Sequence, residues 1–205
     1  MGTAVLEARP AAAAQASAFV SGTAEVPRKK WTRTEYRKLI EIGFLPDGKV
    51  ELVNGEIWEK MGQGRRHIAT VTWILQALAA VFGLERMQTQ SSLPVGEYGD
   101  PEPDVALLTG SMDQYLEEEP TLADMLLVVE AADSTLRGDL SGKVIQYGSG
   151  GIPEYWVVDI RNRLLHVFRE PTSDGYASVT VLTTEEGVRP LAAPDHVVRV
   201  ADLLP

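Results

Sequence analysis

The sequence lacks cysteine entirely and has only three histidines. Without cysteine there are no disulfide bonds and no thiolate metal sites, as is usual for proteins of a reducing cytoplasm. No apolar run reaches the about 20 residues that a membrane-spanning helix needs. The first residues also lack the basic start and continuous apolar stretch of a secretory signal. We therefore expect a cytoplasmic protein with no membrane segment.

Positive charge is also scarce, because 19 basic residues face 29 acidic ones and the net charge is −10. Nucleic-acid-binding proteins usually carry a basic surface, since neutralising phosphates supplies most of their non-specific affinity. The composition therefore argues against a tight, free-standing DNA-binding protein. Two basic clusters, Arg65-Arg66 and residues 28–38, are candidates for steering phosphate, although a solvated surface is the commoner explanation for each.

The chain length of 205 residues fits one domain, with enough apolar residues for a substantial core. Residues 1–26 are rich in alanine and show no apolar periodicity. We predict that they form a flexible leader outside the fold. Residues 27–205 are then expected to form a single domain.

Local signals predict the first elements of this domain. Thr32 followed by Glu35 predicts a capped helix that ends near Gly43. Asn54-Gly55 between two strand-like segments predicts a β-hairpin. Apolar residues at helical spacing predict a long helix over residues 65–82.

Two short, wholly apolar runs, residues 105–108 and 125–129, predict buried neighbouring strands. A further strand is expected over residues 84–95 and a helix over residues 140–147. Later apolar segments predict an antiparallel C-terminal meander with strands at residues 154–159, 164–169, 177–182 and 197–200. The predicted class is mixed α/β (α+β), with a mixed sheet flanked by helices.

Charged residues stand at the ends of the two apolar runs. Asp104 precedes the first run and Glu130 follows the second. A buried carboxylate is costly without a partner or a metal ion, and two of them at one sheet edge suit Mg²⁺, with Mn²⁺ as an alternative. Such an ion polarises a phosphoryl oxygen and lowers the pKa of a bound water. The ammonium of Lys143 would offset the charge on a phosphate.

Each of these residues also has an ordinary structural explanation. A Pro-Asp pair often forms a turn, and a glutamate after an apolar run is often a solvated strand end. Asp139 and Lys143, four residues apart, fit an exposed ion pair on a helix. The combination in this order nevertheless favours phosphodiester chemistry.

The chain resembles a known family, the Uma-type family of putative restriction endonucleases, which is a branch of the PD-(D/E)XK nuclease superfamily. The resemblance covers about residues 30–200. It rests on residues 50–57 (Val-Glu-Leu-Val-Asn-Gly-Glu-Ile), His67, residues 102–106 (Glu-Pro-Asp-Val-Ala), residues 128–130 (Val-Val-Glu), Asp139 with Lys143 and Tyr147, and residues 151–159 (Gly-Ile-Pro-Glu-Tyr-Trp-Val-Val-Asp).

The resemblance implies a restriction-endonuclease-like core with a divalent-metal site at one sheet edge. Asp104 and Glu130 would be the metal carboxylates and Lys143 the catalytic lysine. The superfamily usually places its lysine two positions after the second acidic residue, where this chain has Ala132. The resemblance implies that the lysine has moved to the following helix, where Asp139 would orient it.

Three further residues have both functional and structural explanations. Glu51 is either an additional metal ligand or an exposed strand residue, with the two about equal. His67 is either a contact for phosphate or water or, slightly favoured, a capping or packing residue. Tyr147 either reaches the cleft or, more commonly for a tyrosine in this pattern, packs in the core.

The sequence thus predicts a Mg²⁺-dependent endonuclease that hydrolyses DNA phosphodiester bonds through a metal-activated water. The alternative is a non-catalytic binding or regulatory module that retains the fold, as the acidic charge and the missing motif lysine suggest. A hydrolase with paired carboxylates and another substrate, in the manner of a glycosidase, is disfavoured by the lysine. The resemblance and the aromatic C-terminal strands are compatible with a homodimer.

Overall fold

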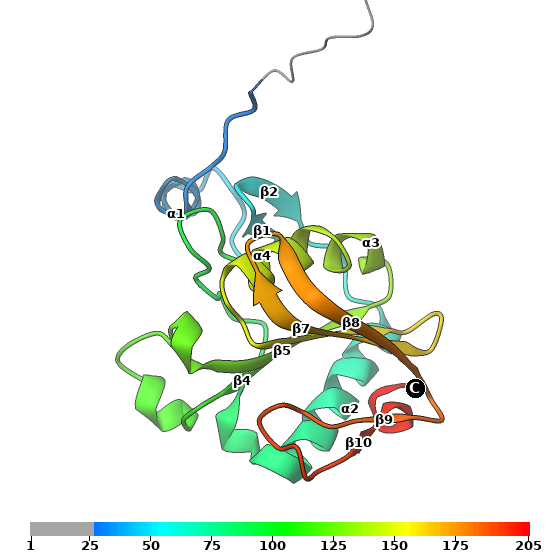
Figure 1. Ribbon diagram of the computed structural model, residues 1–205. Coiled ribbons are helices and arrows are strands. Elements are labelled where there is room, and N and C mark those ends of the chain that lie inside the picture. Colours follow the sequence, from blue (N-terminus) through cyan, green and yellow to red (C-terminus); the bar gives the residue numbers. More distant parts are fainter. Residues whose placement is uncertain (1–26) are drawn as a thin grey trace, which may run out of the picture.

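The computed structural model describes residues 27–205, so the predicted leader lies outside the described residues. A six-stranded mixed sheet forms the centre, in the order β3-β4-β5-β6-β7-β8 (Figure 1). Strands β5 and β6 run parallel, and the other neighbours are antiparallel. The predicted mixed α/β class is confirmed. The strands are β3 (Met87–Gln88), β4 (Val105–Leu108), β5 (Met125–Ala132), β6 (Glu154–Asp159), β7 (Leu164–Thr172) and β8 (Gly175–Thr183).

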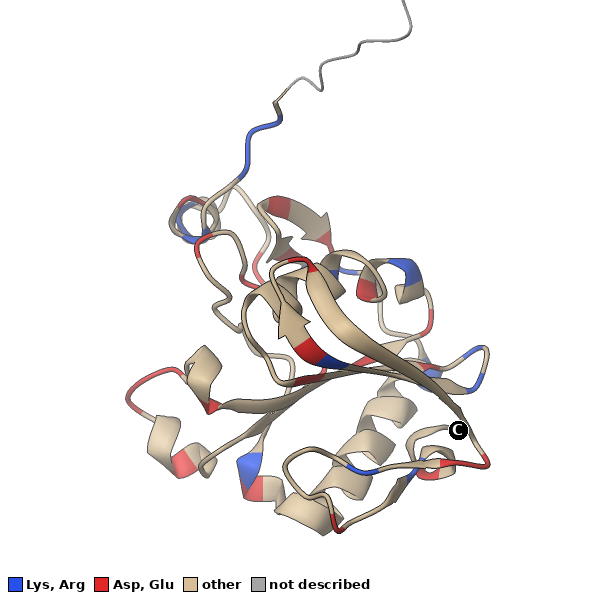
Figure 2. Cartoon of the chain, in the orientation of Figure 1, with Lys and Arg blue, Asp and Glu red and all other residues tan. Residues whose placement is uncertain are grey.

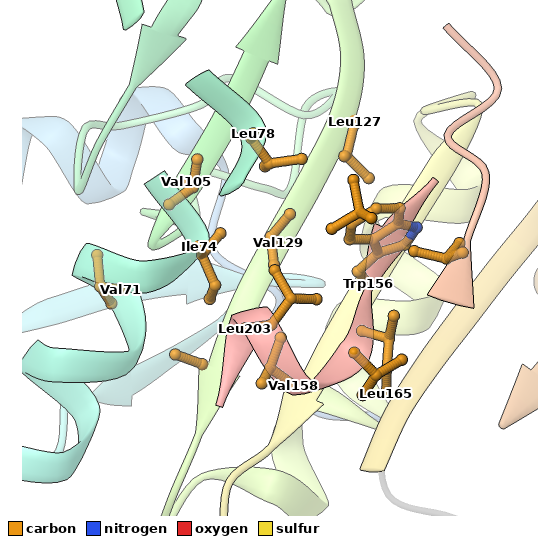
Figure 3. Close-up of a cluster of buried hydrophobic side chains, with 14 of the residues drawn as sticks. Val71, Ile74, Leu78, Val105, Leu127, Val129, Trp156, Val158, Leu165 and Leu203 are labelled. Carbon is orange, nitrogen blue, oxygen red and sulfur yellow. The ribbon is translucent and has the colours of Figure 1, made fainter. Parts of the chain in front are cut away.

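One face of the sheet is covered by α2 (Arg65–Phe82) and the C-terminal 3₁₀ turn η4 (Val200–Leu203). The predicted long helix is confirmed at both ends. It buries Val71, Leu78 and Phe82 of the helical apolar pattern, whereas Ile68, which belongs to the same pattern, is 53% exposed. Figure 3 shows the resulting core, in which Val71, Ile74, Leu78, Val105, Leu127, Val129, Trp156, Val158, Leu165 and Leu203 are labelled.

The opposite face is covered by α3 (Leu136–Asp139) and α4 (Gly142–Ser149). The helix predicted over residues 140–147 is confirmed as α4, which ends at its C-cap Gly150, and a break in the chain at residues 140–141 separates it from α3. Tyr147 and Tyr155 are fully buried here, with ring centroids 4.9 Å apart. This break matters for the site, since it separates Asp139 from Lys143.

The C-terminal meander is confirmed for β6, β7 and β8. The strand predicted over residues 197–200 is present as β10 (Val198–Arg199), but its place in the meander is wrong, because β10 pairs with β9 (Gly187–Val188) in a separate two-stranded sheet. The side chains of Val198, Val200 and Leu203 are buried in the core beneath the large sheet. Their burial beside α2 draws the segment away from the edge at β8.

The N-terminal elements match their local signals. Helix α1 (Arg33–Glu41) begins with the predicted capping box of Thr32 and Glu35. The hairpin of β1 (Val50–Val53) and β2 (Glu56–Glu59) turns at Asn54-Gly55, both with positive φ. The register of this hairpin places Glu51 directly opposite Trp58.

The strand predicted over residues 84–95 is wrong except for the two residues of β3. Its start is a 3₁₀ turn, η1 (Leu84–Arg86), and most of the remainder is irregular. Gln90 has a positive φ, and Pro94 cannot donate to a strand partner, so neither suits a continuous strand. Two further 3₁₀ turns, η2 (Met112–Tyr115) and η3 (Leu122–Asp124), lie between β4 and β5.

Over the described part of the chain, no helix combines the length and the apolar character that crossing a bilayer requires.

Gly148 provides a test of the packing between α4 and β8. A Cβ atom added there would lie 2.0 Å from the carbonyl oxygen of Gly175. We expect Gly148→Ala to lower the free energy of unfolding by about 1–3 kcal/mol, even though alanine favours helices. Urea denaturation measures this, with Gly62→Ala as the control, since a Cβ there meets nothing within 4 Å. Equal stabilities for the two variants would contradict the packing.

His166 on β7 should make stability depend on pH. Its Nε2 is buried without a hydrogen-bond partner, and burial lowers its pKa below the ordinary value despite Asp159 nearby. The unfolded state therefore binds the proton more readily, and stability falls as the pH drops below about 6.5. We expect His166→Gln to lose less of its free energy of unfolding than the parent between pH 7.5 and about 5.5. Parallel pH profiles would contradict this.

Candidate active site

A pocket of about 480 Å³ opens between the β1–β2 hairpin, the start of α2, the β4–β5 edge and α3. Seven acidic and three basic side chains line it, so its wall carries excess negative charge. Six of the seven predicted site residues line this pocket, and the seventh, Tyr147, contacts one of them. The six are Glu51, His67, Asp104, Glu130, Asp139 and Lys143.

The pairing of β4 with β5 places the two principal carboxylates at one edge of the sheet. Val105 lies opposite Val129 in this antiparallel pair, so Asp104 and Glu130 lie next to each other across the strands. The N–H of Ala131 donates to Asp104 Oδ2 at 2.9 Å. Glu130 was expected at the end of its strand, but β5 continues to Ala132. The parallel pairing with β6 carries the strand past the glutamate.

Lys143 lies at the centre of the carboxylates. Its Nζ is 2.9 Å from Glu130 Oε1, 3.2 Å from Glu51 Oε1 and 3.8 Å from Asp139 Oδ1. Lysine and carboxylates are all buried, so the alternative of an exposed helical ion pair is wrong. Burial alone would lower the pKa of Lys143, but the three carboxylates raise it above its ordinary value. Lys143 therefore stays positively charged at neutral pH.

The carboxylates around Lys143 are held by neutral donors. The Tyr147 hydroxyl donates to Glu130 Oε1 at 3.0 Å, and the Thr135 hydroxyl donates to Asp139 Oδ2. Burial raises the pKa of Glu130 well above its ordinary value, against the attraction of Lys143. Tyr147 is thus both a core residue and a contact of the cluster.

Glu51 is buried, so the exposed-strand alternative for this residue is wrong. Its Oε2 accepts a hydrogen bond from the backbone N–H of Glu102 at 3.2 Å, while its Oε1 contacts Lys143. The side chain of Glu102 in turn pairs with Lys60 at the pocket wall. Glu51 therefore ties the hairpin to the strand edge that carries Asp104.

His67 bridges the same edge from α2 and makes no cap for that helix. Its Nδ1 lies 2.8 Å from the carbonyl oxygen of Ala131, so Nδ1 carries the hydrogen. Its Nε2 lies 3.0 Å from Asp104 Oδ1 in an ion-pair contact, outside hydrogen-bond geometry. With Nε2 unprotonated, two lone pairs would face each other there. The carboxylate of Asp104 accordingly raises the pKa of His67 against the effect of burial.

Asp104 is stabilised as an anion. Burial opposes its ionisation, but His67 and the N–H of Ala131 together hold its pKa below the ordinary value. Asp104 is therefore charged at neutral pH, whereas burial raises the pKa of Glu130.

The carboxylate oxygens of the pocket are of the type that binds a hard divalent cation. In the described part of the chain, no three His, Cys, Asp or Glu side chains gather in a group that could by itself hold a metal ion. Carboxylate oxygens are nevertheless the ligands that Mg²⁺ prefers, and Mg²⁺ commonly takes only one or two of them and keeps several waters. The negative wall of the pocket favours a cation. Asp104 and Glu130 at the strand edge, with Glu51 beside them, thus fit such an ion.

The basic clusters lie outside this arrangement. In residues 28–38, Lys29 pairs with Glu35, Arg37 with Asp100 and Lys38 with Glu41. Arg65 and Arg66 are exposed at the start of α2 and do not line the pocket. Three of the six basic residues in the first cluster are therefore paired with acidic side chains.

Four residues contribute to the pocket or to its hydrogen bonds in ways not expected from the sequence: Thr135 and Trp58 through their side chains, and Ala131 and Glu102 through their backbone N–H groups. The hairpin register could have identified Trp58, because Asn54-Gly55 fixes it opposite Glu51. No pattern in the sequence marks the backbone contacts, which depend on how β4 meets β5.

Lys143 should be essential for stability as well as for the site. Removing one partner of a buried ion pair leaves uncompensated charge, so we expect Lys143→Met to cost about 3–5 kcal/mol of unfolding free energy. Lys38→Met, which removes an exposed pair with Glu41, should change it by less than about 1 kcal/mol. Urea denaturation at pH 8 in EDTA measures both variants. A small loss for Lys143→Met would contradict the charge cluster.

Comparisons with known proteins identify the fold and the family of the chain. No curated protein shows significant similarity to the chain. A solved structure, a putative nuclease belonging to DUF820 from Anabaena variabilis ATCC 29413, matches 80% of this chain and 96% of its own. The TM-score is 0.62 at 17% sequence identity, a likeness of fold. A model of the Uma2 family, described as putative restriction endonuclease, matches residues 33–201. The chain therefore belongs to the Uma2 family.

Proposed function

We propose that this protein is a divalent-metal-dependent nuclease that hydrolyses phosphodiester bonds in DNA. The observation that carries the proposal is the gathering of Asp104, Glu130 and Lys143 at one pocket wall, although 39 positions separate the first from the last. The description of the family and that of the structural relative support it.

Asp104 and Glu130, with Glu51 beside them, would hold Mg²⁺ or Mn²⁺. When bound, such an ion supplies a polarised phosphoryl oxygen and a more acidic water. Negative charge dominates the pocket wall, so a polyanionic substrate gains a favourable site only when cations accompany it. This accounts for a DNA-directed site in an acidic protein.

Lys143 acts as a fixed positive charge. Its raised pKa keeps the ammonium protonated, so it can donate hydrogen bonds to a phosphate oxygen but cannot serve as a general base. Glu130, Glu51 and Asp139 hold the ammonium in place before the substrate arrives. A preorganised charge of this kind stabilises the negative charge that builds up in the transition state.

His67 and Tyr147 position the carboxylates. The ring of His67 joins the carboxylate of Asp104 to the carbonyl of Ala131, which fixes Asp104 at the strand edge. The hydroxyl of Tyr147 fixes Glu130 by donating a hydrogen bond to its Oε1. Both residues therefore act by keeping the acidic pair in register.

A second candidate is a non-catalytic module that retains the fold. It is favoured by the pairing of each carboxylate with Lys143, His67 or a backbone N–H, and by the lack of a three-donor metal group among residues 27–205. Such a module would keep its stability and bind partners, but it would not cleave DNA with any divalent ion.

A cleavage assay separates the two candidates. We expect the full chain to cut DNA with Mg²⁺ or Mn²⁺, and Asp104→Asn or Glu130→Gln to lower the rate by about 10²–10³-fold. Asp133→Asn is the matched control, because Asp133 lines the same pocket but pairs with Arg161 at the surface. EDTA should abolish the activity. Activity that survives both Asp104→Asn and Glu130→Gln would refute the proposed site.

A further inference from the structure

Trp58 lies beside the charged cluster but makes none of its hydrogen bonds or ion pairs. It lines the pocket from β2, directly opposite Glu51 in the hairpin. Cross-strand partners project from the same face of a hairpin, so the indole emerges next to the carboxylate that contacts Lys143. The side chain is only half-buried. A large aromatic surface is thus available next to the proposed phosphate site.

The position of the indole is fixed by two glycines. A Cβ added at Gly142 would lie 2.4 Å from the Trp58 ring, and one at Gly138 would lie 3.0 Å from it. Neither glycine has a positive φ, so backbone conformation does not require them. They give the indole room, although glycine disfavours the short helices in which they lie. One edge of the ring therefore rests on α3 and α4. These two helices lie beside the hairpin in Figure 1.

The surroundings offer little for gripping a duplex. Of the three basic side chains in the pocket, Lys143 and Lys60 already contact carboxylates. Figure 2 shows Lys and Arg scattered along the chain and interspersed with Asp and Glu. Proteins that hold duplex DNA neutralise several phosphates in a row. Proteins that hold single strands draw much of their affinity from stacking bases on aromatic side chains.

We propose that Trp58 stacks against an unpaired nucleobase, and that the substrate of this site is single-stranded DNA or an unpaired DNA end. The inference rests on the proposed function, since it places the base next to a phosphate held at Lys143. The pocket volume of about 480 Å³ falls among sites for small ligands, which suits one nucleotide. Stacking on an indole accepts every base, so the site reads no sequence.

Binding measurements test the stacking directly. The probe is a fluorescein-labelled oligothymidylate of about eight nucleotides, compared with a labelled hairpin duplex, by anisotropy in Ca²⁺. We expect the full chain to prefer the single strand, Trp58→Leu to weaken that binding roughly tenfold, and Trp58→Phe to retain most of it. Trp73→Leu is the matched control, because Trp73 is also half-buried but lines a separate groove beside η4.

Binding and cleavage measurements together separate the proposed base contact from the proposed nuclease activity. Equal binding by Trp58→Leu and Trp73→Leu, or a preference for the duplex, would overturn the inference, with thermal unfolding used to confirm that both variants are folded. Cleavage of both DNAs with Mn²⁺ is then measured separately. Duplex cleavage without a single-strand preference would preserve the nuclease and overturn the inference. Single-strand binding through Trp58 with no cleavage at all would support the base contact and reject the nuclease.

Discussion

The ion cluster around Lys143 is the constraint on which the rest of the structure depends. One ammonium and the carboxylates of Glu51, Glu130 and Asp139 are buried together, and each charge would be costly without the others. Four elements must be in place to satisfy it: β1, β5, α3 and α4. Apolar residues at these positions would stabilise the folded state as much as the buried charges do. Under the proposed function, this buried charge is what the architecture holds in place for the substrate.

The core explains how such a cluster can be held. β5 lies in the middle of the sheet between β4 and β6, and Val128, Val129, Ala131 and Ala132 are fully buried along it. Glu130 therefore extends from a rigid strand, and Tyr147 reaches it from α4 on the same face as its other contacts. Asp104 lies just before β4, where the sheet meets α2 and His67. The site is thus built where the sheet, the hairpin and helices from both faces converge.

Local signals in the sequence predicted most of the fold. The capping box at Thr32, the Asn54-Gly55 turn and the helical periodicity of residues 65–82 each act through neighbours in the chain, and each was confirmed. The strand predicted over residues 84–95 was wrong for most of its length, because the apolar and β-forming residues there contact different parts of the molecule without forming a ladder of backbone hydrogen bonds. The final predicted strand forms outside the meander, because its apolar side chains pack beside α2, which no local pattern reveals.

The site was predictable in its members but not in its contacts. The order of Asp104, Glu130 and Lys143 along the chain was enough to select these residues as candidates. The antiparallel register of β4 with β5 brings Asp104 and Glu130 together. The burial of Glu51, the break between α3 and α4, and the bridging position of His67 depend on distances that a sequence does not contain. The place of Trp58 beside the site could have been predicted, because the hairpin turn fixes its position opposite Glu51.

The proposed function requires this acidic pocket to hold a divalent cation through Asp104 and Glu130. Titration of the full chain with Mn²⁺ by calorimetry tests this requirement without any assumption about substrate. We expect a saturable site that is lost in Asp104→Asn and Glu130→Gln and kept in Asp133→Asn. Equal binding of Mn²⁺ by all four proteins, or no binding by the parent chain, would contradict it.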